Sequence, residues 1–122
     1  MSKYRNTKVK VDGIVFDSKK EANYYLFLKE EEAAGKISDL RLQVPYVLIP
    51  AVWKTRIKHL KTKNKEETYC AQRSVKYVAD FVYVDNMTGR EEVVDVKGRK
   101  TKEYILKKKM MLAFHDIEII EV

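Results

Sequence analysis

Two carboxylates stand alone inside valine-rich runs of the sequence, Asp80 in VADFVYV and Asp95 in VVDVKG. Acidic residues are rare in buried strands, so each of them needs a compensating partner. Two unscreened carboxylates about 4 Å apart repel by about 4 kcal/mol at an effective dielectric of 20, and a bound cation removes that repulsion. Mg²⁺ takes one or two carboxylates and completes its shell with waters and phosphate oxygens. The pair therefore predicts a Mg²⁺ or Mn²⁺ site for phosphate chemistry.

A lysine follows the second acid closely. Lys97 lies two residues after Asp95, and the two-residue period of a strand places both side chains on the same face. Its amine could orient or deprotonate an attacking water, or neutralise the transition state. Two structural alternatives remain, an ion pair between Asp80 and Lys97 and an exposed Asp95–Lys97 pair of little energetic value.

The two acids are expected on adjacent antiparallel strands. The runs RSVKYVADFVYVD and EEVVDVKG are rich in β-formers and are joined by the turn NMTG. In the first run, strict alternation predicts Tyr77, Ala79 and Phe81 on the face opposite to Asp80. An earlier strand is expected at about 40–49, where Pro45 favours an edge position or a bulge.

A helix is expected from Ser18 to about Ala34, before these strands. Ser18 lies three residues before Glu21, the spacing of a capping box, and Gly35 provides the stop. The helical spacing also predicts that Leu26 faces the core. Two roles are expected for the Glu21 carboxylate: it caps the helix by reaching back to the Ser18 amide, or it takes part in the functional site.

A second helix is expected at about 101–114, with Thr101 as its N-cap. Its inward-facing residues are expected to be Tyr104, Ile105, Met111 and Leu112. The run IEIIEV then closes the chain as a short strand. A tight hairpin around Asp12-Gly13 precedes all of these elements. The order predicts an α/β fold whose last strand, helix and strand form a right-handed parallel crossover.

The charge distribution points to a polyanionic partner. Lys and Arg number 25 against 18 Asp and Glu, a formal net charge of +7. Basic residues gather at 1–10, 54–65 and 97–109, and a basic strand pair is expected to project at about 51–68. Within it, Trp53 is expected to pack at a sheet edge, with base stacking as the alternative. The candidate nucleic-acid-binding residues are Lys54, Arg56, Lys58, Lys61, Lys63, Arg99, Lys100, Lys102, Lys107 and Lys108.

Composition excludes several other classes of protein. A chain of 122 residues with 45% hydrophobic residues allows one folded domain. One cysteine and two histidines leave no disulfide and no structural zinc site, and no glycine-rich loop suggests an organic cofactor. The sequence shows neither a membrane-spanning run nor a secretion signal, so a cytoplasmic protein is expected.

With these residues the chain resembles the PD-(D/E)xK phosphodiesterase superfamily, which includes restriction enzymes, Holliday-junction resolvases and small phage endonucleases. The matching motifs are VADF, DVK and the acid of SKKEANYY, and Ala79 stands where the name-giving proline often lies. The resemblance implies a restriction-endonuclease-like core of helix, three-stranded antiparallel meander, helix and strand, with a mixed central sheet. It also implies that Asp80, Asp95 and the Val96 carbonyl bind metal, with Glu21 as a further ligand or a supporting group.

The sequence thus predicts a single nuclease-like domain over residues 1–122, a Mg²⁺- or Mn²⁺-dependent DNA endonuclease of a bacterial host cell. By the resemblance it is phage-encoded, acts on branched or structured DNA and forms a homodimer. The expected catalytic residues are Glu21, Asp80, Asp95 and Lys97. Two alternatives are a non-catalytic nucleic-acid-binding module and an interaction protein with an acidic protein partner.

Overall fold

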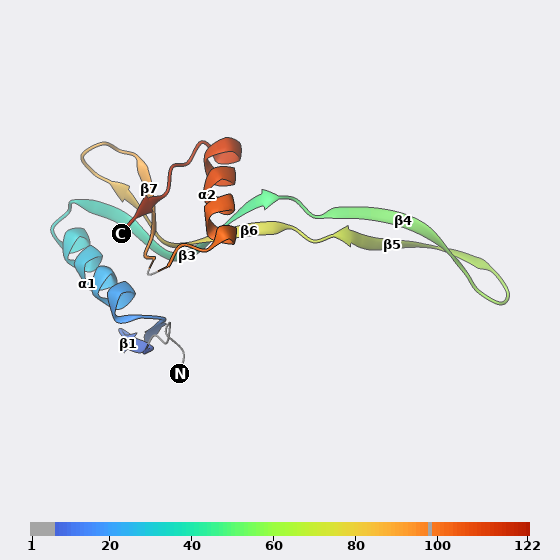
Figure 1. Cartoon of the computed structure of the whole chain (residues 1–122), viewed down its shortest axis with the longest axis horizontal. Coiled ribbons are helices and arrows are strands. Elements are labelled where there is room, and N and C mark those ends of the chain that lie inside the picture. Colours follow the sequence, from blue (N-terminus) through green and yellow to red (C-terminus); the bar gives the residue numbers. More distant parts are fainter. Residues whose placement is uncertain (1–6, 98) are drawn as a thin grey trace.

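The chain folds as an α/β protein, as predicted, and the computed structural model describes residues 7–97 and 99–122 (Figure 1). Gly98, the expected strand breaker, lies outside the described residues. The elements in chain order are β1 (Val9–Val11), β2 (Ile14–Phe16), α1 (Lys19–Ala33), β3 (Ile37–Ile49), β4 (Val52–His59), β5 (Asn64–Gln72), β6 (Val75–Asp85), β7 (Glu91–Asp95), α2 (Lys102–His115) and β8 (Ile120–Glu121). In the described part of the chain, no helix is long and apolar enough to cross a membrane.

A mixed four-stranded sheet forms the centre of the fold, in the order β3-β6-β7-β8. The first three strands are antiparallel, and β8 runs parallel to β7 after the α2 crossover. β3 is an edge strand, so the edge position expected from Pro45 is confirmed. The strand is longer than predicted, because pairing with β6 already begins at Ile37.

The two helices cover opposite faces of this sheet, and side-chain caps fix where each one begins. Ser18 Oγ accepts a hydrogen bond of 3.2 Å from the Glu21 amide, and Thr101 Oγ1 accepts one of 3.1 Å from the Tyr104 amide. The neighbouring residues Val93 and Val94 enter different hydrophobic clusters, one with α2 and the other with α1. The acids of β6 and β7 therefore lie in a sheet that is covered on both sides.

The strict alternation predicted for β6 is wrong after Asp80. Tyr77 and Ala79 pack in the cluster with α2, whereas Phe81 packs in the cluster with α1 and Val82 returns to the α2 side. Phe81 pairs with Val94 of β7, and both residues are buried under α1. The change of face falls directly beside the predicted catalytic acid.

Several helix positions predicted to face the core are exposed. Leu26 of α1 and Ile105 and Leu112 of α2 keep 43%, 43% and 52% of their surface accessible. On α1, Leu28 is buried instead, at 1% exposure. Each helix buries only a narrow strip of its surface, which on α2 consists of Tyr104 and Met111, and the flanking apolar residues are exposed.

Strands β4 and β5 form an arm that projects from the body along the longest axis of the molecule (Figure 1). This two-stranded β4–β5 arm (residues 52–72) matches the projecting strand pair predicted at about 51–68. Every residue of β4 is exposed. Trp53 is 64% exposed, so the prediction that it packs at a sheet edge is wrong.

Candidate active site

Asp80 lies within β6, on the strand segment that passes the end of β7. Its Oδ2 accepts a hydrogen bond of 2.8 Å from the backbone amide of Val96, and its Oδ1 lies 3.4 Å from the Gln43 side-chain amide. Burial raises the pKa of Asp80 to about 6, and the nearby charge of Asp95 acts in the same direction. The Val96 amide and Lys97 act in the opposite direction, because both favour the charged carboxylate.

Asp95 is the last residue of β7 and is almost completely buried, at 1% exposure. Phe81 pairs with Val94, so Asp95 lies opposite Asp80 in the next step of the ladder. The Tyr77 hydroxyl donates a hydrogen bond to Oδ2. Oδ1 makes no hydrogen bond within the described part of the chain, although the Lys97 ammonium lies at ion-pair distance. A buried carboxylate oxygen in this state still has capacity for a cation.

The Lys97 ammonium contacts one carboxylate and one aromatic ring. Its Nζ lies 3.4 Å from Asp95 Oδ1 and 4.7 Å from the centre of the Tyr104 ring. The common side predicted for Asp95 and Lys97 is therefore confirmed, although β7 itself ends at Asp95. A cation over an aromatic face is stabilised by the ring quadrupole, so this geometry favours a charged ammonium with a defined position.

Glu21 reaches the same place from the first turn of α1. The residue is 8% exposed, and its Oε1 lies 3.5 Å from the Gln43 side-chain amide. Burial raises the pKa of Glu21 to about 7, with added effects from the charges of Asp80, Asp17 and Asp95. Within the described residues, the Ser18 cap is one-sided: Ser18 accepts from the Glu21 amide, while the Glu21 carboxylate turns to Gln43.

Gln43 links two of the acids and was missed by sequence reasoning. Its neighbours in β3 pair with Phe81 and Ala79, which places Gln43 opposite Asp80. Its backbone has a φ of 52°, in the left-handed region that is costly for a residue with a side chain. Its position beside Asp80 follows from the pairing register of β3 and β6, which the sequence alone does not specify.

The four predicted catalytic residues thus come together, while a three-carboxylate centre does not form. Among residues 7–97 and 99–122, no three His, Cys, Asp or Glu side chains are arranged to hold a metal ion. The possible metal ligands are the carboxylates of Asp80 and Asp95, which lie opposite each other beside the backbone of Val96. Oδ1 of Asp95 is buried and makes no hydrogen bond within the described part of the chain. This set fits a hard cation that takes two carboxylates and fills its shell with water. Glu21 lies at the margin of this site, and the Gln43 side chain lies between it and Asp80.

The candidate nucleic-acid-binding residues divide into two groups with different environments. Near α2, three lysines are engaged by acids: Lys100 and Lys108 contact Glu121 at 3.3 and 2.9 Å, and Lys107 contacts Glu103 at 3.0 Å. In the β4–β5 arm, only Arg56 has an acidic partner among the described residues, Glu67 at 3.2 Å. The basic residues before Thr7 lie outside the described residues.

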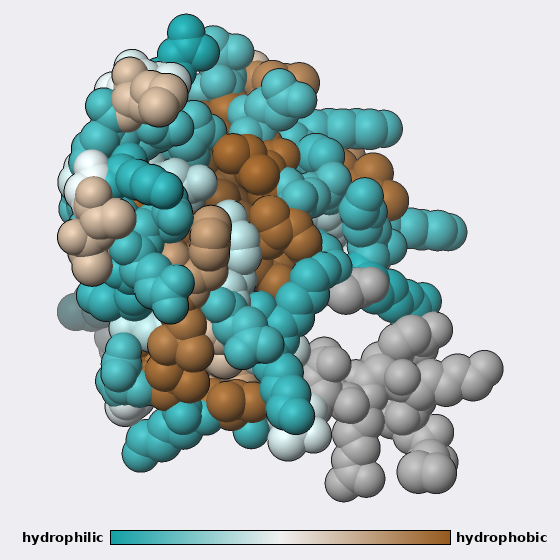
Figure 2. All heavy atoms as spheres, turned by 90° about the vertical axis from the view of Figure 1, so that its left-hand side faces the viewer, coloured by the Kyte–Doolittle hydropathy of each residue, from teal (hydrophilic) through white to brown (hydrophobic). Residues whose placement is uncertain are grey.

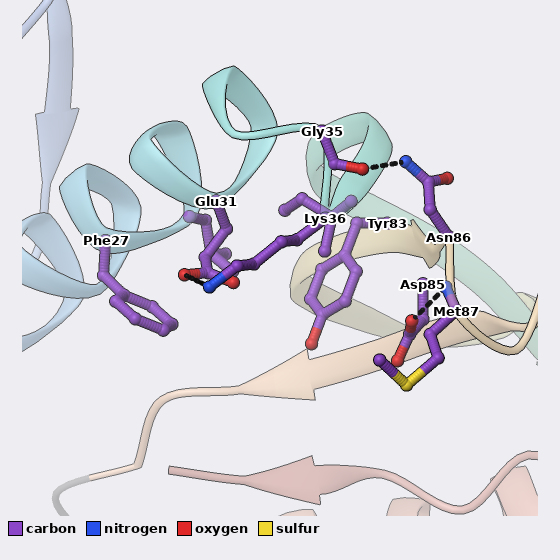
Figure 3. Close-up of a pocket in the computed structure, with 10 residues that line it drawn as sticks. Phe27, Glu31, Gly35, Lys36, Tyr83, Asp85, Asn86 and Met87 are labelled. Atoms are coloured by element: carbon purple, nitrogen blue, oxygen red, sulfur yellow. Dashed lines mark hydrogen bonds and ion pairs between the residues drawn. The ribbon is translucent and has the colours of Figure 1, made fainter.

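Two cavities beside the helices lie away from the acids. One of about 580 Å³ lies between α1 and the β6–β7 turn, with Phe27, Tyr83 and Met87 among its lining residues (Figure 3). It lies toward the end of the molecule opposite the arm, where Figure 2 shows hydrophobic surface in a central band between hydrophilic groups. The other, of about 450 Å³, is lined by Ile105 and Leu112 of α2 beside β8. Neither cavity is lined by a predicted catalytic residue.

Fold and site together define an α/β protein whose mixed sheet, covered by two helices, carries the buried Asp95, the half-buried Asp80 and a lysine beside them. The chain belongs to DUF1064, a family of proteins of unknown function, whose family model matches residues 1–120. No curated protein and no solved structure matches the chain.

Proposed function

We propose that the chain is a Mg²⁺- or Mn²⁺-dependent DNA endonuclease that hydrolyses phosphodiester bonds. The observation that carries the proposal is the convergence of Glu21, Asp80 and Asp95 with Lys97, from α1, β6 and the end of β7. Like charges gathered in a partly buried place raise one another's pKa, and a bound cation relieves that repulsion. The net charge of +7 suits a nucleic-acid substrate.

Each residue has a definite part in this proposal. Asp80, Asp95 and the Val96 carbonyl would hold the metal ion, and Glu21 would serve as a further ligand or act through Gln43. When bound there, the metal ion would supply Lewis acidity toward the phosphate and toward a water molecule. The Val96 amide fixes the orientation of Asp80, and Tyr77 fixes that of Asp95. These contacts preorganise both carboxylates before substrate arrives.

Lys97 would stabilise the negative charge that develops on the phosphate. Its ammonium already contacts one carboxylate and one aromatic ring, which suits a fixed positive charge better than a base. With a cation held at Asp95, the Lys97 ammonium would lose its ion pair and would be available to the phosphate. A proton donated from Nζ to the leaving oxygen is compatible with the same position.

The finer identity of the enzyme rests on the resemblance to PD-(D/E)xK nucleases. The order α1, β3, β6, β7, α2 and β8 supports a restriction-endonuclease-like core. By the same resemblance, the protein is a small phage-encoded nuclease that acts in the bacterial cytoplasm on branched DNA, close to the Holliday-junction resolvases. A homodimer would supply the two sites that cleavage of two strands requires.

A second candidate function is a nucleic-acid-binding module without catalysis. Two observations favour it: the described residues form no three-ligand metal group, and Lys97 already pairs with Asp95. In this case the acids serve only to hold β6, β7 and α1 together. The basic surface alone would then carry the function.

Cleavage assays distinguish the two functions. The purified chain is incubated with linear, nicked and four-way DNA in Mg²⁺, in Mn²⁺ and in EDTA. The nuclease proposal expects metal-dependent cleavage that Asp95→Asn abolishes while DNA binding remains. Binding without cleavage of any of these DNAs in either metal would leave the binding module as the function.

A further inference from the structure

Most basic side chains of the β4–β5 arm have no acidic partner among the described residues. Within the described residues, no acidic group lies within ion-pair distance of five of its lysines. They are Lys54, Lys58, Lys61, Lys63 and Lys65. The lysines near α2 differ, because Glu121 and Glu103 engage three of them. An anionic partner that binds the arm therefore displaces fewer internal ion pairs than one that binds α2.

The pairing register gathers much of this charge on one face of the arm. Residues directly opposite each other in an antiparallel pair share a face, and Lys54, Arg56 and Lys58 of β4 lie opposite Tyr69, Glu67 and Lys65 of β5. Lys58 and Lys65 thus form a directly opposed pair of like charges, which destabilises an isolated ribbon. A partner that supplies negative charge to both strands would relieve the repulsion between these two lysines near the arm's tip.

The arm also lacks a core that could hold it in the free protein. All of β4 is exposed, and a two-stranded hairpin alone is marginally stable in water. A two-stranded ribbon fits the major groove of duplex DNA, where phosphates line both sides. Charge and shape therefore agree on a nucleic-acid duplex as the occupant.

The length of the strands gives the distance from the acids at which such contacts would occur. Val75 begins β6 five residues before Asp80, so the base of the arm lies about 17 Å from the acid at about 3.3 Å per residue. The eight residues of β4 add about 26 Å in the direction seen in Figure 1. With about 3.4 Å per base pair, this interval corresponds to about 5 to 13 base pairs of duplex.

We propose that the β4–β5 arm binds duplex DNA through its basic face, about 5 to 13 base pairs away from the phosphate at the acids. The inference rests on the proposed nuclease function for the position of the cut. It adds a requirement that the acids do not impose: the substrate needs a duplex extension on the side of the arm. Structure-selective cleavage would then follow from the geometry of the arm and need no base reading.

Binding measurements with charge variants test the role of the arm. The variant K54Q/K58Q/K65Q and the charge-matched control K29Q/K36Q/K109Q are titrated with fluorescent duplex DNA in EDTA over a range of salt concentrations. The arm variant should lose affinity by about tenfold or more, and its salt slope should fall by about 3. Equal losses in both variants would overturn the inference. Circular dichroism confirms that both variants fold.

Duplex length provides the second measurement. Wild-type protein should bind a duplex of about 20 base pairs much more tightly than one of about 8, and the arm variant should lose most of this difference. A length dependence that is unchanged in the arm variant would overturn the inference. The two proposals can fail separately. If the arm variant loses DNA affinity but the wild-type protein cleaves no DNA in Mg²⁺ or Mn²⁺, the nuclease function is rejected and DNA binding by the arm is retained. If the wild-type protein cleaves DNA but the arm variant binds it as tightly as wild type, DNA binding by the arm is rejected and the nuclease function is retained.

Discussion

The backbone amide of Val96 donates a hydrogen bond of 2.8 Å to Oδ2 of Asp80, which ties the acid of β6 to the chain directly after β7. An asparagine at position 80 can still accept this bond through its carbonyl oxygen, so Asp80→Asn should fold normally. It removes a negative charge from the proposed metal site, and cleavage should fall by at least about 100-fold. DNA binding should be unchanged or tighter, because less negative charge faces the phosphates. Cleavage rates and duplex titrations in EDTA measure the two effects.

The matched control is Asp116→Asn. Asp116 is an exposed acid at the end of α2 with a left-handed backbone, which asparagine also adopts readily. The control should cleave at the wild-type rate. Cleavage by Asp80→Asn at the wild-type rate would remove Asp80 from the proposed metal site.

Lys97 should stabilise the metal-free fold as well as assist catalysis. Lys97→Met leaves the buried Asp95 carboxylate with the Tyr77 hydroxyl as its remaining side-chain partner among the described residues. Removing one member of such a pair should lower the free energy of unfolding by about 3 kcal/mol, as measured by urea denaturation in EDTA. Lys36→Met is the control, because its ion pair with Glu31 is exposed and should contribute less than about 1 kcal/mol. Equal effects in the two variants would show that Asp95 does not depend on Lys97.

The stability of the metal-free protein should depend on pH between about 4 and 7. In the folded chain, the pKa of Glu21 is raised from 4.5 to about 7 and that of Asp80 from 3.8 to about 6. A raised carboxyl pKa means that the folded state binds the proton more tightly than the unfolded state does. The free energy of unfolding should therefore decrease as the pH rises through this range. Urea denaturation at pH 4.5 and pH 7.5 in EDTA measures the change.

Mg²⁺ should act in the opposite direction, because protons and metal compete for the same carboxylates. Its stabilising effect should be larger at the higher pH. Glu21→Gln is the control for the proton effect, since its side chain stays uncharged, and it should show a weaker dependence on pH. A free energy of unfolding that increases with pH in both proteins would contradict the assignment of these two groups.

The local elements and the acid–lysine pair could be predicted from the sequence because they depend on short-range chemistry. The Ser18 and Thr101 caps, the Asp12-Gly13 turn and the Asp95–Lys97 contact follow from spacings of a few residues. The edge position of Pro45 follows from its missing amide hydrogen. Such signals are complete within one element or one turn.

The rest depends on tertiary contacts that single elements do not encode. The position of Gln43 opposite Asp80 requires the β3–β6 register, and the change of face at Phe81 requires the packing of α1. The exposure of Ile105, next to the buried Tyr104, depends on which side of α2 packs on the sheet. Charges also cannot be judged free or paired from the sequence, as the contact between Lys108 and Glu121 shows.

Gln43 should be a positioning residue that costs stability. Its φ of 52° suits glycine, so Gln43→Gly should raise the free energy of unfolding by about 0.5 to 1 kcal/mol. The same change removes the amide that lies near both Glu21 and Asp80, at 3.5 and 3.4 Å, so cleavage in Mg²⁺ should slow. Asp39→Gly is the matched control, because Asp39 has a φ of 53° in the same strand and is exposed. It should gain similar stability and cleave at the wild-type rate. If Gln43→Gly gains stability and keeps full activity, the amide has no part in positioning the acids.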